Sequence, residues 1–227
     1  TSTNYDKTEK KIVGGKNGFG FKLVLIWSTW GKVETVDHTR KLKYTQEFGE
    51  NLTKIGKPVI EKFEGAPYTK ISFKPDYKRL KVPGLYKDMF NLLKKRVFDI
   101  AAVTPRKVEV KFNDSMIHVR NFTDYVSMYI GDNSETKRVF ETADDRWEFA
   151  VSISPYDEFT QVSFVNGINT MKGGKHVDYI LNKIVKGVVD YIKKKKKIVV
   201  KPVTVKEQLM LFVNCSVENP SFDSQTK

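Results

Sequence analysis

The feature that most constrains this chain is a glycine-rich stretch near its start, residues 14–22, which runs directly into the apolar residues 23–27. Glycine occupies four of the seven positions from 14 to 20, so the backbone there can take positive φ and expose its N–H groups. If a helix begins at the end of this loop, those N–H groups and the positive helix end face one point and favour a phosphate, with Lys16 and Lys22 adding charge. A turn between two strands uses glycines in the same way, so the pattern alone leaves both interpretations open.

Composition indicates a folded globular protein. The chain has 227 residues, of which 40% are hydrophobic and 30% charged, enough for one large domain or two modest ones. No apolar run approaches the roughly 20 residues that cross a bilayer, so no membrane is expected as a partner. The single cysteine, Cys215, rules out an internal disulfide and is expected to be a buried strand thiol. Three scattered histidines show no metal-ligand spacing, so no metal site is predicted.

Positive charge is the strongest compositional signal. The net charge is +13, and residues 193–197 form an unbroken run of five lysines. A basic surface binds polyanions by releasing counterions and implies no sequence recognition. Lysines also keep a protein soluble, and five like charges at a helix end are typical of an exposed loop. The run therefore predicts either a DNA contact or a solvated loop.

The first half alternates between strand and helix patterns. Residues 23–28 predict a short helix, and residues 33–36, 43–48 and 68–74 predict strands of an antiparallel meander. Residues 84–104 have helical spacing, with a packing stripe that consists of Leu85, Met89, Leu92, Leu93, Val97 and Ile100. A hairpin around residues 113–115 and a helix over 122–130 follow, and residues 131–134 predict a domain joint.

The second half predicts three strands, over residues 137–141, 146–154 and 159–165, and then an amphipathic helix from Gly174 to Ile192. Thr204 to Glu207 fits a capping box that opens a short helix before a last strand, residues 211–217. Helices between strands imply crossover connections on a sheet. The fold class is therefore α+β.

Several motifs in fixed order resemble one family. They read TSTNYD at residues 1–6, GGKNGFGFKL at 14–23, FVNGINTMKGGKHVDYI at 164–180, the lysine run, and NPSFDSQTK at 219–227. Together they resemble the ATPase side of type IIA DNA topoisomerases, of the eukaryotic or large-virus kind. The resemblance implies a partial GHKL-type antiparallel sheet with helices over residues 1–131. It also implies a transducer domain over 132–227 that contains a left-handed βαβ crossover.

The resemblance implies that the glycine loop wraps the triphosphate of ATP. The residues that would bind the nucleotide are Ser2, Thr3, Asn4, Gly15, Lys16, Asn17, Gly18, Phe19, Gly20, Lys22 and Gln225. Lys227 would bring charge to the γ-phosphate and is the one candidate catalytic residue. The loop departs from the family's usual RNGYGAK, and the added bulk of Phe21, Leu25, Trp27 and Trp30 is expected to fill a cavity. Phe21 would also crowd the phosphate, which leaves open whether this lid binds nucleotide.

The resemblance also implies partners. Residues Lys193, Lys194, Lys195, Lys196 and Lys197 match the family's K-loop, which is expected to contact the phosphates of duplex DNA. The intact enzyme would be a nuclear or viral homodimer that uses ATP and Mg²⁺, with the remainder of the topoisomerase as partner. The family's base and metal ligands lie upstream of Thr1, so the chain alone is not expected to hydrolyse ATP efficiently. A non-enzymatic DNA-binding or scaffold module, which needs no cofactor, stays as the alternative.

Overall fold

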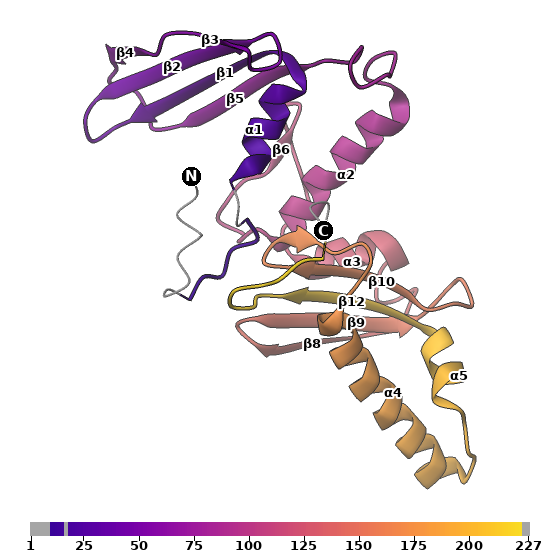
Figure 1. Ribbon diagram of the computed structural model, residues 1–227. Helices are drawn as coiled ribbons and strands as arrows, with labels where there is room; N and C mark the ends of the chain where they lie inside the picture. The colour runs from indigo at the N-terminus through magenta and orange to yellow at the C-terminus, as the bar shows by residue number, and fades with distance from the viewer. Residues whose placement is uncertain (1–9, 16–17, 224–227) are drawn as a thin grey trace. The chain divides into compact units, whose positions relative to one another are not determined.

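The computed structural model describes residues 10–15 and 18–223, which form two compact units. Within these residues one unit consists of residues 15–87, and the other consists of residues 10–14 together with 88–223 (Figure 1). The two units are described separately. No helix among the described residues is both long enough and apolar enough to span a bilayer.

The first unit is a five-stranded antiparallel sheet with one helix. Its elements are α1 (Phe19–Ile26), β1 (Ser28–Asp37), β2 (Leu42–Gly49), β3 (Lys54–Ile55), β4 (Val59–Lys62) and β5 (Thr69–Pro75). The three predicted strands are confirmed, but the predicted meander is wrong. The order is β3-β2-β1-β5, because β3 and β4 both pair with the outer edge of β2 and leave β5 to pair with β1.

Helix α1 is fixed to this sheet along one side and at its end. Leu25 is 4% exposed and lies on Gly31 of β1, where a Cβ atom would come within 2.4 Å of the leucine Cδ2. The Arg79 guanidinium donates to the Ile26 carbonyl at 3.0 Å and stacks 4.5 Å from the Trp27 ring centroid. These contacts satisfy the carbonyl end of the helix, so its position relative to the sheet is defined.

The second unit is built on a mixed sheet with helices. Its elements are α2 (Lys87–Val103), β6 (Lys111–Phe112), β7 (Ser115–Met116), α3 (Phe122–Ile130), β8 (Arg138–Asp144), β9 (Trp147–Ile153), β10 (Thr160–Val165), β11 (Ile168–Asn169), α4 (Lys175–Lys196), α5 (Pro202–Glu207) and β12 (Leu209–Cys215). The large sheet has the order β11-β10-β12-β9-β8, with β10 and β12 parallel and all other pairs antiparallel. A parallel pair joined through α4 and α5 is the predicted crossover, and its left-handed sense stays a prediction. The α+β fold class is confirmed.

Strand β12 is the centre of the second unit because both of its faces are buried. Met210 and Phe212 face a cluster that includes Phe122 and Tyr125 of α3, whereas Leu211 and Val213 face the apolar side of α4. A strand covered on both sides reads as a continuous apolar run, as residues 209–213 do. Each fully buried side chain of this size contributes about 1.5–3 kcal/mol.

The packing stripe predicted for α2 is only partly right: Val97 packs against the buried cluster, but most of the predicted leucines do not. Leu92, Leu93 and Ile100 are about half exposed, whereas Asp99, Ala101 and Ala102 are buried. The buried side of α2 carries small residues and one acid because it packs in the same cluster as the large aromatic rings of α3, which occupy the available space.

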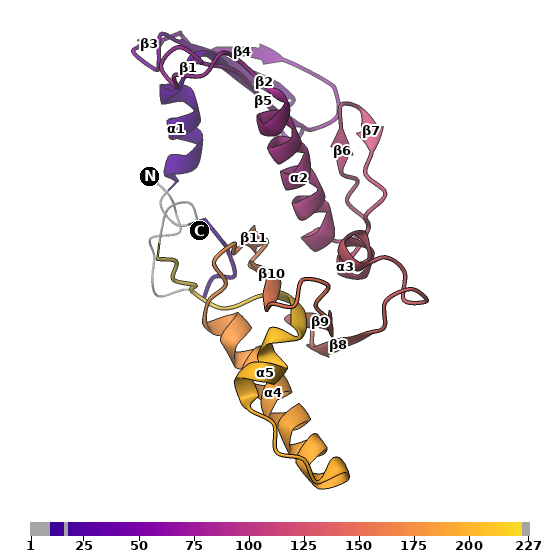
Figure 2. The same cartoon turned by 90° about the vertical axis from the view of Figure 1, so that its right-hand side faces the viewer.

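The two ends of the α4–α5 connection also differ from the sequence prediction. Helix α4 continues to Lys196, so four of the five lysines are helical, and Lys197 ends it at φ 60°. Helix α5 begins at Pro202 and not at a Thr204 capping box, because proline at the first helical position loses no intrahelical hydrogen bond. Helix α5 lies beside α4 in both views (Figures 1 and 2).

The structural units do not coincide with the predicted domains 1–131 and 132–227. Helix α3 packs in the same cluster as the sheet of the second unit, and the compact units separate between Lys87 and Asp88. The functional boundary near Gly131 therefore stays a prediction.

Candidate functional site

The glycine loop leads into the positive end of α1. Gly18 takes φ 66° and is the N-cap of the helix, which begins at Phe19, four residues earlier than predicted. No side chain among the described residues caps this end, so within that part of the chain the first N–H groups of the helix have no side-chain acceptor. A Cβ atom at Gly20 would meet nothing within 4 Å, so this glycine leaves open space beside the helix start. The arrangement fits an anion.

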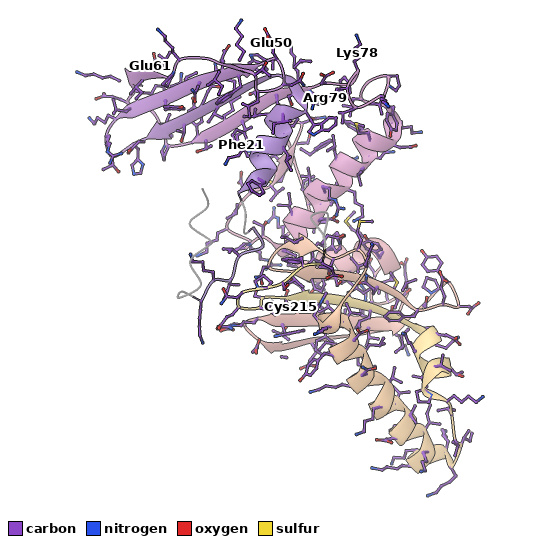
Figure 3. The ribbon with its side chains drawn as sticks, in the orientation of Figure 1. Phe21, Glu50, Glu61, Lys78, Arg79 and Cys215 are labelled. Carbon is purple, nitrogen blue, oxygen red and sulfur yellow. The ribbon has the colours of Figure 1, made fainter. Side chains whose placement is uncertain are left out.

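The side chains around this helix start are cationic and aromatic. Lys22 lies in the first turn of α1 with its Nζ atom 5.9 Å from the Phe19 ring centroid. Phe19 and Phe21 are both exposed, and Phe21 is labelled in Figure 3. Lys16 and Asn17, which were predicted to bind nucleotide, lie outside the described residues.

The prediction that Phe21 fills a core is wrong, because its side chain is 38% exposed. We therefore expect Phe21→Ala to change the free energy of unfolding by less than about 1 kcal/mol. Leu25→Ala in the same helix is the matched control and should cost about 2–5 kcal/mol, because Leu25 is buried on Gly31. Urea unfolding of both variants checks this; equal losses would contradict the assignment of α1 faces.

The chain enters the glycine loop beside the segment that leads to the C-terminus. The Asn219 N–H donates to the Lys11 carbonyl at 2.9 Å, and the Lys11 N–H donates to the Asn219 side chain at 3.4 Å. Glu218 joins the same contact, with its carboxylate 3.1 Å from Arg146 and 3.2 Å from Lys10. The hydrogen bonds from Arg146 and Lys10 hold the pKa of Glu218 below its usual value.

Asn166 binds both of these segments. Its side-chain oxygen accepts from the Val217 N–H at 2.7 Å, and its amide donates to the carbonyls of Val217 at 2.9 Å and Val13 at 3.4 Å. Asn166 and Gly167 have positive φ and form the tight turn between β10 and β11. Gly14 lies against this hairpin so closely that a Cβ atom would come within 2.1 Å of Ile168 Cδ1.

The structure thus brings together the approaches to two predicted site segments, residues 10–14 and 217–219, through Asn166. Of the remaining predicted residues, Ser2, Thr3, Asn4, Gln225 and Lys227 lie outside the described part of the chain. The sequence analysis missed the roles of Asn166, Glu218 and Asn219. An Asn-Gly pair between two strand patterns is the one local signal that could have indicated the Asn166 turn.

The lysine run lies at the far end of α4. Lys193 to Lys197 are all exposed, and within the described residues none of them forms an ion pair. Cations are favourable at the negative end of a helix, so the run extends α4 by a turn and does not unfold it. The predicted exposure is confirmed, and the predicted loop is corrected to a helix end.

A buried ionic cluster joins α2 to α3. Asp99 is 3% exposed and accepts from Lys95 at 2.8 Å, from Arg96 at 3.0 Å and from the Tyr125 hydroxyl at 2.6 Å. Burial and then the hydrogen bond to Asp99 raise the pKa of Tyr125, so the hydroxyl stays protonated as a donor. Every oxygen of the buried carboxylate is satisfied, so this cluster fixes the packing of the two helices.

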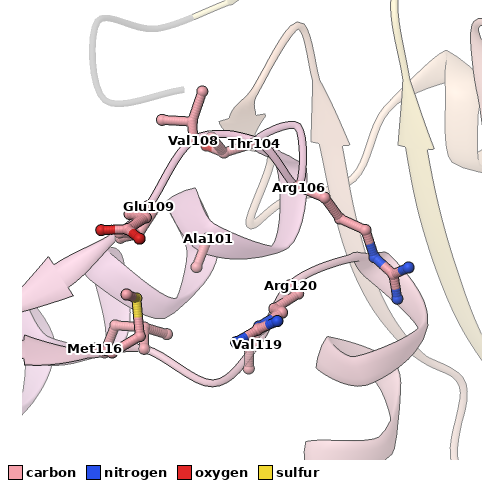
Figure 4. A pocket seen from close by; sticks show the side chains of 10 residues that line it. Ala101, Thr104, Arg106, Val108, Glu109, Met116, Val119 and Arg120 are labelled. Carbon is pink, nitrogen blue, oxygen red and sulfur yellow. The ribbon is translucent and has the colours of Figure 1, made fainter.

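The cavity, the acidic and histidine side chains and the single cysteine do not add to the site at the glycine loop. A cavity of about 130 Å³ lies between the end of α2 and the β6–β7 hairpin, with Arg106 and Arg120 among its lining residues (Figure 4). No group of three His, Cys, Asp or Glu side chains in the described ranges could hold a metal ion. Cys215 is buried as predicted, and burial raises its pKa to about 12, so it is not a nucleophile.

Comparison with known proteins gives one consistent result. The family model described as DNA gyrase B matches residues 121–227. DNA topoisomerase 2 of Arabidopsis thaliana is 45% identical over 235 residues, and that of Acanthamoeba polyphaga mimivirus is 44% identical over 231 residues. Both alignments cover 100% of this chain, which spans only 16% and 18% of those two relatives.

Solved structures agree with these relatives. The ATPase region of Saccharomyces cerevisiae topoisomerase II superposes with a TM-score of 0.91 at 39% identity, and covers 100% of this chain. The ATPase and transducer domains of DNA topoisomerase II from Balamuthia mandrillaris give a TM-score of 0.91 at 40% identity. This chain covers 59% and 58% of those two structures.

Proposed function

We propose that this chain, which belongs to the type IIA DNA topoisomerase family, is part of an ATP-operated DNA clamp. All of the chain aligns with the ATPase region of that family. In this proposal the intact enzyme is a nuclear or viral homodimer that binds ATP and encloses duplex DNA. The rest of the topoisomerase would supply the DNA-cleaving core.

The proposed nucleotide site is the start of α1. The N–H groups after Gly18, which no described side chain caps, the open space at Gly20 and the charge of Lys22 support binding of the ATP phosphates. Gly15, Lys16, Asn17, Phe19 and Gln225 would complete the contacts, with Ser2, Thr3 and Asn4 on the ribose or phosphates. Lys227 would place a compact positive charge at the γ-phosphate. Mg²⁺ would accompany the nucleotide on ligands outside the described residues.

The observation that carries the proposal is the contact of residues 10–14 with residues 217–219 through Asn166. One of these segments continues into the glycine loop and the other into Gln225 and Lys227. Nucleotide bound at the glycine loop would act on residues 10–14 and, through Asn166, on a hairpin of the large sheet, and this gives a route by which the transducer registers the nucleotide state. Lys193 to Lys197 would meet DNA phosphates without reading bases.

The test uses Asn166→Gly, which removes the side chain and keeps the positive φ that the turn needs. Loss of the three hydrogen bonds between the Asn166 side chain and the backbone, of about 1 kcal/mol each, should weaken binding of a non-hydrolysable ATP analogue with Mg²⁺ about tenfold or more. Titration calorimetry measures this, with the exposed Asn133→Gly as control. Equal affinities for the two variants would count against the coupling, provided that both still melt cooperatively.

A DNA-binding scaffold that takes no nucleotide is the second candidate. It is favoured by one observation, the benzyl group of Phe21 in the first turn of α1, where a phosphate needs close access to the backbone. The same titration distinguishes the two functions, because a scaffold should bind DNA while showing no heat with the ATP analogue.

A further inference from the structure

We propose that the DNA-contacting surface continues from the lysine run along the whole exposed face of α4, with Lys175, Lys183 and Lys186 as additional phosphate contacts. This inference rests on the proposed function and adds a surface to it. It concerns the second unit alone, and every residue in it lies in the described part of the chain.

The face is defined by the helical spacing of its members. Steps of three or four residues place one row of side chains on the same side of a helix. In α4 this row consists of Lys175, Tyr179, Lys183, Lys186, Asp190, Lys193 and, at the C-cap, Lys197. All seven are exposed, and the opposite side of the helix is buried through Val177, Ile180, Leu181 and Val185. The lysine row therefore points away from the sheet.

The charges on this row are not balanced within the protein. Lys175, Lys183 and Lys186 form no ion pair with any described residue, and Asp190 is the single acid among the seven positions. Like charges three or four residues apart destabilise a helix by a few tenths of a kcal/mol per pair. In this row Lys183 with Lys186 and Lys193 with Lys197 have that spacing, so an external polyanion would relieve the repulsion within these two pairs.

The length and shape of the row select duplex DNA. The 18 helical steps from Lys175 to Lys193 span about 27 Å at about 1.5 Å per step, and about 16 phosphates lie along that length of duplex. A straight helix matches a straight, stiff duplex. Single strands bind by stacking bases on open aromatic rings, but the Lys183 Nζ atom lies 4.4 Å from the Tyr179 ring centroid and covers that ring.

The test compares two double variants of the 227-residue chain for binding to a random-sequence duplex. Lys183→Gln with Lys186→Gln should reduce the slope of log affinity against log salt by about 1.8, because each phosphate contact contributes about 0.9. The control is Lys107→Gln with Lys137→Gln, two exposed lysines of the same unit that form no ion pair with another described residue. The control should leave the slope unchanged, and equal slopes for both doubles would overturn the proposal.

Two more variants keep this result interpretable. Asp190→Asn removes the acid from the row and should raise duplex affinity, whereas an unchanged or lower affinity would contradict a phosphate-facing row.

Alanine replacement of Lys194 to Lys196 tests the lysine run separately. If that triple flattens the slope and the Lys183/Lys186 double does not, the DNA contact stops at the run and only this inference fails. Tighter binding to single strands than to duplex would also overturn it.

Discussion

Replacing Lys194, Lys195 and Lys196 with alanine should flatten the salt dependence of duplex binding by up to about three units of log–log slope. The three side chains are exposed on the last turn of α4, where none of them pairs with an acid in the described part of the chain, so their charge stays available. Binding should become weaker for every duplex sequence alike, because phosphate contacts carry no base information. Fluorescence anisotropy between about 50 and 200 mM salt measures the slope.

The matched control removes three exposed lysines elsewhere in the same unit, Lys94, Lys107 and Lys137. Lys10 is unsuitable for this purpose, because it pairs with Glu218. Both triples should fold with nearly unchanged stability, since exposed charges contribute little. If both lower the slope equally, DNA binds to a generally basic surface, and the assignment of Lys193 to Lys197 as a specific contact is wrong.

Removing both cations from the buried cluster, in the double variant Lys95→Ala with Arg96→Ala, should produce a large loss of stability. Asp99 would keep its buried negative charge. Of the three side chains that donate to it, only the Tyr125 hydroxyl would remain. Breaking a fully buried pair costs about 3–5 kcal/mol, and we expect ~2–3 kcal/mol here because both cations are partly exposed. Urea unfolding at neutral pH gives the value.

The rescue variant separates charge from packing. Adding Asp99→Asn to the double variant removes the uncompensated charge and keeps the shape, so part of the lost stability should return. If the triple variant is less stable than the double, the loss comes from the lysine and arginine stems and not from the carboxylate. Asp88, an exposed acid in the first turn of α2, provides the control position for the same Asp→Asn change.

The sequence predicted an element correctly where residues at its own ends determine where it starts and stops. Helix α3 begins and ends where the sequence indicated, because Asn121 caps it by accepting from the Asp124 N–H at 2.7 Å and Gly131 ends it at φ 72°. Strands β1, β2 and β5 were also found from their alternation. Where these elements lie relative to one another depends on distant partners, so the pairing of β5 with β1 could not be read from the sequence.

The errors share one physical origin. The buried side of α2 is decided by the aromatic rings of α3, so periodicity alone selected Leu92 and Ile100 when Asp99 and Ala102 are buried. The role of Asn166 depends on backbone atoms 51 and 153 residues away, and no spacing rule reaches that far. The glycine loop could be proposed as a site from the sequence because the residues that suggest it lie within one short segment.

The most direct test of the central claim follows the backbone amide signals of the chain by NMR while a non-hydrolysable ATP analogue with Mg²⁺ is added to millimolar concentration. If the start of α1 binds the phosphates, the amides of Gly18, Phe19, Gly20 and Phe21 should shift together and saturate, and Lys22→Gln should weaken that response. If those four amides stay unchanged at millimolar analogue while duplex DNA still shifts the amides of α4, the glycine loop is not a nucleotide site.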